Sequence, residues 1–225
     1  MAIRTKCFIV AVLFVFPLLP ALAAPAAVGA DMTIGRMRVM IWPEHDDPGV
    51  LVVYDGRFVE DSLFPTTTKF IIPKNVVIND ICSLSPGGQH FCQLYETEEG
   101  EKQDFANLSL PFSNFYVSFH TLSLDTKSEN RSFDYKIKAN HPIRSLEVDI
   151  KQPLRSSDFN IFPAGGEMSV KKGSTHYKYT LKDIAKGEER VFKISYVKKD
   201  AAPSVEIKFA SMSGPRVWGS PYEAQ

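Results

Sequence analysis

Many short segments of this sequence alternate apolar and polar residues with a period of two, and this pattern limits the fold more than any other feature. Residues 131–139 show it clearly, because Phe133, Tyr135, Ile137 and Ala139 are apolar and the positions between them are Asp or Lys. Residues 145–151 and 190–196 repeat it. Successive side chains of a β-strand point to opposite faces, so each segment predicts a strand with one buried face and one exposed face.

Clusters of Pro, Gly, Asn and Asp separate these segments at short intervals, as at residues 46–49, 85–88 and 163–166. No segment has a sustained helical periodicity, and residues 180–186 offer one helical turn at most. About 10–12 short strands therefore predict an all-β fold with little or no helix. We expect an antiparallel β-sandwich, either immunoglobulin-like or jelly-roll-like.

Three regions are predicted along the chain. Residues 1–23 form a signal peptide, residues 31–200 the β-sandwich domain, and residues 201–225 a C-terminal extension that is partly disordered. The polar stretch 125–130 leaves open a division into two smaller sandwiches, and one domain is the preferred interpretation.

The first residues have the pattern of an export signal. Arg4 and Lys6 precede the apolar run 7–19, and residues 21–23 (Ala-Leu-Ala) supply the small side chains that signal peptidase requires. Cleavage is expected after residue 23, or alternatively after residue 30. A helix needs ~20 apolar residues to span a bilayer, and no later segment approaches that length. The mature protein is therefore expected to lack a transmembrane segment and to be periplasmic or extracellular.

Removal of the signal peptide, which contains Cys7, leaves two cysteines, Cys82 and Cys92. An even number in an oxidising compartment predicts one disulfide. Residues 76–84 and 89–95 have strand character on either side of the turn 85–88, and each cysteine lies five positions from Gly87. Directly opposite residues of a hairpin have Cβ atoms ~4.5–5.5 Å apart, which suits a bridge. The spacing is not Cys-x-x-Cys, so a structural role is favoured over a redox or metal-binding one.

The charge balance argues against one class of partner. The 225 residues include 26 Lys and Arg and 26 Asp and Glu, so the formal net charge is zero. Residues 1–30 hold two basic residues and no acidic one, and their removal leaves 24 against 26, a charge of −2. Nucleic-acid binding requires a basic excess to neutralise phosphates, so no nucleic-acid partner is expected.

Motifs that carry catalysis are missing from the sequence. None of the five histidines stands in His-Glu-x-x-His, and there is no Gly-x-Ser-x-Gly, Walker loop or Gly-x-Gly-x-x-Gly. We therefore predict no catalytic residue, no metal and no cofactor, although the members of a catalytic triad need not be close in sequence.

Binding, if it occurs, is predicted at one loop and at the tail. The loop 42–49 combines an aromatic ring, three carboxylates and an imidazole, a set that could hold a hard cation such as calcium. Capping of the turn by Asp side chains is the favoured interpretation of the same residues. Aromatic side chains are enriched at binding hot spots, which adds the tail. The candidate binding residues are Trp42, Glu44, His45, Asp46, Asp47, Trp218 and Tyr222.

The stretch Met40–Tyr54 resembles the opening of a poorly characterised type of exported bacterial β-sandwich protein. Such proteins begin with Trp-Pro-Glu…Asp-x-Pro-x-Val-Leu-Val-x-Tyr, and residues 140–143 and 152–154 fit the same pattern. The family has no assigned activity, so no catalytic residue is carried over. The resemblance implies a sandwich fold and a place in the cell envelope.

These features predict an exported, non-catalytic β-sandwich that acts as a binding or assembly module in the bacterial cell envelope. Its partner would be an unknown envelope protein or a polysaccharide. A carbohydrate-binding module is the alternative, and coplanar exposed aromatics would favour it, whereas an apolar patch would favour a protein partner. A hydrolase with a dispersed site is the second alternative, which a cleft holding carboxylates of strongly shifted pKa would signal.

Overall fold

A computed structural model describes residues 32–92, 95–121 and 124–205 of the chain. The described residues form fourteen β-strands and a single 3₁₀ turn, η1, at Asp61–Leu63. The strands are β1 (Ile34–Pro43), β2 (Val50–Phe58), β3 (Thr66–Ile72), β4 (Val77–Leu84), β5 (His90–Cys92), β6 (Tyr95–Glu98), β7 (Asp104–Leu110), β8 (Asn114–His120), β9 (Asn130–Lys138), β10 (Ile143–Lys151), β11 (Ser156–Phe162), β12 (Glu167–Lys171), β13 (Ser174–Ile184) and β14 (Glu189–Lys198).

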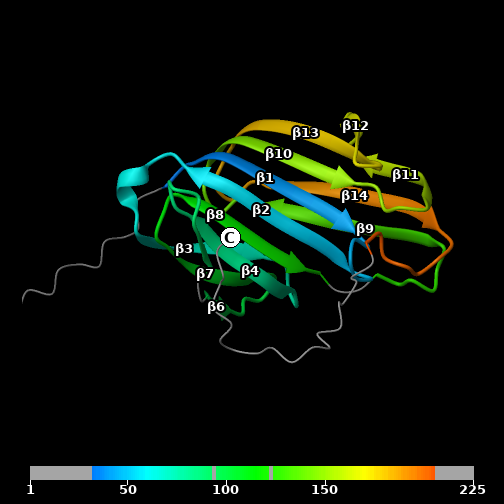
Figure 1. Cartoon of the computed structure of the whole chain (residues 1–225), viewed down its shortest axis with the longest axis horizontal. Coiled ribbons are helices and arrows are strands. Elements are labelled where there is room, and N and C mark those ends of the chain that lie inside the picture. The colour runs from blue at the N-terminus through cyan, green and yellow to red at the C-terminus, as the bar shows by residue number, and fades with distance from the viewer. Residues whose placement is uncertain (1–31, 93–94, 122–123, 206–225) are drawn as a thin grey trace, which may run out of the picture. The chain divides into compact units, whose positions relative to one another are not determined.

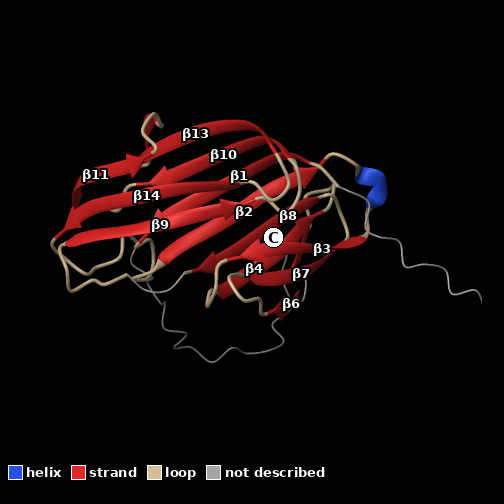
Figure 2. Ribbon diagram, turned by 180° about the vertical axis from the view of Figure 1, so that it is seen from behind, coloured by secondary structure: helices blue, strands red, loops and turns tan. Residues whose placement is uncertain are grey.

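The strands form one large sheet and two small ones (Figures 1 and 2). The large sheet has the order β12-β13-β10-β1-β2-β8-β4-β5, and the small sheets are β11-β14-β9 and β3-β7-β6. Both small sheets pack against the large one. The Tyr54 hydroxyl on β2 lies 2.7 Å from that of Tyr135 on β9, and the ring of Phe70 on β3 lies 4.7 Å from that of Phe115 on β8. One layer of the sandwich is therefore a continuous sheet, and the other is divided.

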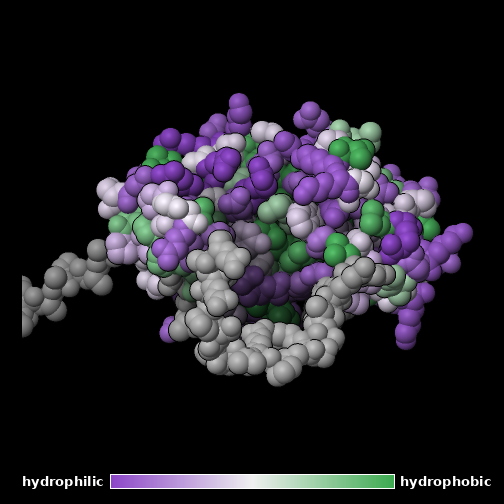
Figure 3. All heavy atoms as spheres, in the orientation of Figure 1, coloured by the Kyte–Doolittle hydropathy of each residue, from purple (hydrophilic) through white to green (hydrophobic). Residues whose placement is uncertain are grey.

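The predicted all-β class is confirmed, and the alternation in the sequence explains the core. In β10, Leu146, Val148 and Ile150 are fully buried, and they lie beside Met37, Val39 and Ile41 of β1. The pairing of β1 with β10 is parallel, so the large sheet is mixed rather than wholly antiparallel. Residues 180–184 continue β13 and do not form the helical turn that the sequence allowed. Hydrophilic side chains predominate on the face seen in Figure 3.

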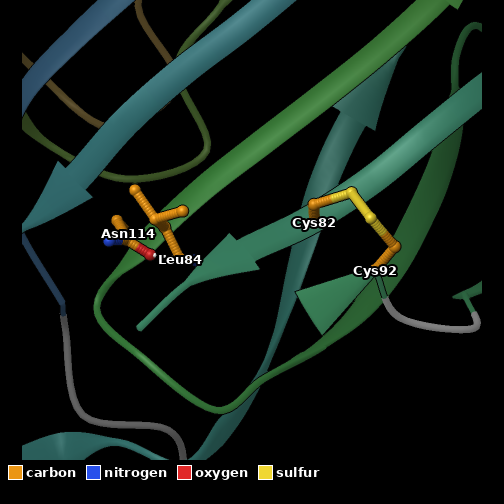
Figure 4. Close-up of a disulfide and its surroundings, with 4 residues drawn as sticks. All are labelled: Cys82, Leu84, Cys92 and Asn114. Atoms are coloured by element: carbon orange, nitrogen blue, oxygen red, sulfur yellow. Dashed lines mark hydrogen bonds between the residues drawn. A yellow bond between two sulfur atoms is a disulfide. The ribbon is translucent and has the colours of Figure 1, made fainter. Parts of the chain in front are cut away.

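The predicted disulfide hairpin is confirmed. β4 and β5 pair with Cys82 directly opposite Cys92, and a disulfide joins the two residues (Figure 4). Next to the bridge, the backbone N–H of Leu84 donates to the side-chain oxygen of Asn114 at 2.6 Å. The hairpin is thereby attached to β8 as well as closed on itself.

The described residues form one compact unit, to which strands on both sides of residues 124–130 contribute core side chains. No helix in the described part of the chain is long and apolar enough to cross a membrane. The predicted signal peptide lies outside the described residues, as do Trp218 and Tyr222.

Candidate functional site

The loop that joins β1 to β2 contains most of the predicted binding residues, and their side chains point in two directions. Glu44 turns inward and is fully buried. Its carboxylate accepts hydrogen bonds from the Tyr196 hydroxyl and the Lys198 ammonium group, each at 2.7 Å, and it also pairs with Arg131. Glu44 therefore belongs to the interior of the sandwich and is not an accessible binding residue.

In this interior cluster one carboxylate pairs with two buried cations, and Lys198 also lies 3.4 Å from Asp200. Burial raises the pKa of the Glu44 carboxyl, but hydrogen bonds from Arg131, Lys198 and Tyr196 outweigh burial and hold the pKa below its ordinary value. Burial and the adjacent carboxylate raise the pKa of the Tyr196 hydroxyl. Glu44 is thus a carboxylate at neutral pH, and Tyr196 is a neutral hydrogen-bond donor.

The same cluster and the neighbouring backbone form hydrogen bonds with the segment that follows β14. Arg131 donates to the carbonyl of Asp200 at 2.7 Å, and the backbone N–H groups of Ser204 and Val205 donate to the carbonyls of Glu44 and His45 at 2.8 and 2.7 Å. Residues 201–205, the first part of the predicted extension, are therefore held against the β1–β2 loop.

Asp46 and Asp47 turn outward, where they meet a histidine that the sequence did not single out. His120, at the end of β8, has Nε2 2.8 Å from Asp46 Oδ1 and 3.9 Å from Asp47 Oδ2, and its Nδ1 contacts Asn79. In the described part of the chain, Asp46, Asp47 and His120 form a group that could hold a metal ion, because one ligand atom from each lies within 4.8 Å of the others. Asp47 also accepts a hydrogen bond from the Gly49 N–H at 2.7 Å, which is the predicted turn-capping role.

Trp42 does not present an open stacking surface. Its ring meets that of His45 edge-on at 4.8 Å, and the Lys151 ammonium group lies 5.3 Å from its centre. Burial, together with the neighbouring Lys151, lowers the pKa of His45, and burial lowers the pKa of Lys151. These contacts favour packing over sugar stacking as the role of Trp42.

A hollow of the described structure lies elsewhere, where the divided layer opens. It is a groove of 890 Å³ between the two small sheets, with Val50 and Tyr54 of β2 at its floor. Ile71 and Ile72 of β3, with Phe105 of β7, line one side. Phe133, Tyr135, Lys136 and Lys138 of β9, with Glu189 of β14, line the other.

Both strands that border this groove have a free edge toward it. β3 pairs only with β7, and β9 pairs only with β14. At one end of the groove the Asn140 side chain donates to the Lys69 carbonyl, and Thr68 Oγ1 lies 2.8 Å from His141 Nε2. These contacts join β3 to the turn between β9 and β10. No local sequence pattern marks this groove, because its walls come from strands far apart in the chain.

At the floor, the tyrosine hydroxyls of β2 and β9 bond to each other at 2.7 Å. Burial raises the pKa of Tyr54 to about 12, and burial also raises that of Tyr135. The floor is therefore uncharged at neutral pH. The charged groups are at the mouth, where Glu189 forms ion pairs with Lys136 and Lys138 at 3.2 and 3.6 Å.

Neither a family model nor a curated protein sequence matches this chain. Among solved structures, the chain is similar to one described as a "putative protease" from Parabacteroides distasonis ATCC 8503, with 8% sequence identity and a TM-score of 0.45. The likeness covers 75% of this chain and 41% of that one. It is distant, and it indicates neither a family nor an activity for this chain.

Proposed function

We propose that this protein is an exported, non-catalytic binding module of the bacterial cell envelope that holds an extended segment of a protein partner in the groove between its two small sheets. One observation carries the proposal: β3 and β9 face the groove with unpaired edges over a floor of buried side chains. The export signal in residues 1–23 and the Cys82–Cys92 bridge agree with an envelope location.

An extended peptide suits this geometry because it can bind the free strand edge and the floor of the groove at the same time. Its backbone can form a ladder of hydrogen bonds with a free strand edge, which is the known mode of β-strand addition. Its alternate side chains can then point to the floor at Val50 and Tyr54, since side chains of a strand alternate between faces. The ion pairs of Glu189 at the mouth would flank the backbone of such a segment.

The two alternatives find less support in the described residues. Tyr54 and Tyr135 are only 4% and 3% exposed, so these two rings do not offer an open platform of the kind that stacks on sugars. A hydrolase that uses a carboxylic acid as its general acid would be signalled by a carboxyl group of raised pKa in a cleft. The carboxyl groups whose pKa departs from the ordinary value, including Glu189 at the groove and Glu44, are all shifted downward.

A peptide-binding measurement tests the proposal. Fluorescently labelled peptides of about 7 residues, with apolar residues at alternate positions, should bind the mature protein and raise fluorescence anisotropy. Phe133→Asp puts a charge on the groove wall and should weaken binding at least tenfold. Phe162→Asp makes the same change at an exposed position on β11 that does not line the groove, and it should bind as the unmodified protein does.

The proposal fails if no peptide of this pattern binds, or if both variants lose binding equally. Binding of oligosaccharides, with loss in Phe133→Asp alone, would instead assign the groove to a carbohydrate-binding module.

A further inference from the structure

Strand β12 leaves one edge of the large sheet exposed and apolar. It is the last strand of that sheet and pairs only with β13. Its two apolar side chains, Met168 and Val170, are 64% and 69% exposed, which places them among the most exposed large hydrophobic residues of the described structure. Free strand edges with apolar side chains are templates for pairing with another chain.

The hairpin geometry shows which backbone groups face outward. Lys172 and Gly173, with φ of 47° and 76°, form a two-residue turn in which both residues have positive φ, and Lys171 and Ser174 close it. The closing pair of such a turn exchanges its hydrogen bonds, and bonded pairs then alternate along the strands. Ser169 therefore bonds to β13, whereas Met168 and Val170 direct their N–H and C=O groups toward the free edge.

The sequence of β12, Glu-Met-Ser-Val-Lys, is complementary to itself when reversed. In an antiparallel pair of two β12 strands centred on Ser169, Glu167 lies opposite Lys171 of the second copy, and Met168 lies opposite Val170. Opposite charges and apolar pairs at directly opposed positions stabilise a sheet. Both charged residues are exposed, and no ion pair engages either of them within residues 32–92, 95–121 and 124–205.

We propose that two copies of this chain associate through their β12 strands around a two-fold axis at Ser169, which joins the two eight-stranded sheets into one. The pairs of Met168 with Val170 and of Val170 with Met168 would supply four backbone hydrogen bonds, because these residues carry the outward groups. A two-fold interface uses the same patch on both copies, as the self-complementary strand requires. Five residues a side make a small interface, so the dimer is weak and depends on protein concentration.

Charge exchange tests the register. Analytical ultracentrifugation of the mature protein over a range of concentrations should detect a monomer–dimer equilibrium. Glu167→Lys alone, or Lys171→Glu alone, places like charges opposite each other at both ends of the interface, and each should raise the dissociation constant roughly tenfold. The double variant Glu167→Lys with Lys171→Glu restores opposite charges and should recover the dimer.

A cysteine at the two-fold axis tests the geometry separately. Ser169 would face its own copy at a non-hydrogen-bonded pair, where side chains are closest. Ser169→Cys should therefore form a covalent dimer under mild oxidation, as seen on non-reducing gels. Ser157→Cys, at an exposed position of β11 on another sheet edge, should not.

The inference is overturned if the unmodified protein stays monomeric at every concentration, or if Ser169→Cys gives no more covalent dimer than Ser157→Cys. It is also overturned if the double charge variant associates no better than the single ones. None of these results depends on the groove, because β12 does not line it.

Discussion

Glu44 and Asp46 are two acidic residues of one loop, two positions apart, and the protein uses them in opposite ways. Glu44 has lost all contact with solvent and is surrounded by Arg131, Tyr196 and Lys198, which come from the far side of the sandwich. The Asp46 side chain keeps 27% of its exposure and meets His120 at the end of β8. Residue type and position in the loop do not explain this difference. It follows from the strands that each side chain contacts, which are β9 and β14 for Glu44 and β8 for Asp46.

This difference has an energetic consequence. A buried carboxylate neutralises cations that cannot reach water, so its loss leaves those cations unpaired. Water can replace a partly exposed carboxylate as the partner of its cation, so its loss changes little. Three measurements test this comparison.

The largest effect is expected for Glu44→Ala. The change leaves the buried side chains of Arg131 and Lys198 without their shared counter-charge, and it removes the acceptor of the Tyr196 hydroxyl. Loss of one partner of a buried pair costs about 3–5 kcal/mol, and the free energy of unfolding in urea should fall by that amount. Asp47→Asn in the same loop is the control and should change it by less than about 1 kcal/mol. Similar losses in both variants would contradict the distinction.

A smaller effect is expected from acid, which should reduce the contribution of Glu44 to the free energy of unfolding. The pKa of Glu44 in the folded protein lies below its ordinary value of 4.5, so its contribution is present above that pH and is lost as the pH falls through the folded-state pKa. The difference in unfolding free energy between the unmodified protein and Glu44→Ala should therefore be constant from pH 7 to about 5 and shrink below about 4.5. Urea unfolding at several pH values measures it. A difference that stays constant down to pH 3 would argue against this account.

The smallest effect is expected for Asp46→Asn. Its side chain is 27% exposed and that of its partner His120 is 14% exposed, and ion pairs that solvent can reach contribute about 0–1 kcal/mol. Thermal and urea unfolding should be nearly unchanged. A loss as large as that of Glu44→Ala would show that the loop acts as one stabilising unit and that the contrast between its two halves is false.

Local features of the fold were predictable from the sequence. The alternation in residues 131–139, 145–151 and 190–196 corresponds to β9, β10 and β14, because a strand with one buried face records that face in every second residue. The Cys82–Cys92 bridge was also predictable, since both residues lie at equal distances from one turn. These predictions use only short-range information, and the all-β class follows from them.

The contacts made by the predicted binding loop could not be predicted from short-range information. Glu44 meets Lys198 across 154 positions of sequence, and His120 reaches Asp46 across 74. No local pattern encodes such meetings, because they depend on the order of strands in the sheets. That order also includes the parallel pairing of β1 with β10, which the alternation alone could not distinguish from an antiparallel one.

By itself, then, the sequence determined the all-β class, the buried faces of β9, β10 and β14, and the place where the disulfide closes. The tertiary structure alone decided that one layer of the sandwich is continuous while the other is divided, and this division creates the groove. The reason is physical. The burial of a strand's face is recorded in its own side chains, whereas its neighbour is chosen by the packing and hydrogen bonding of the whole sheet.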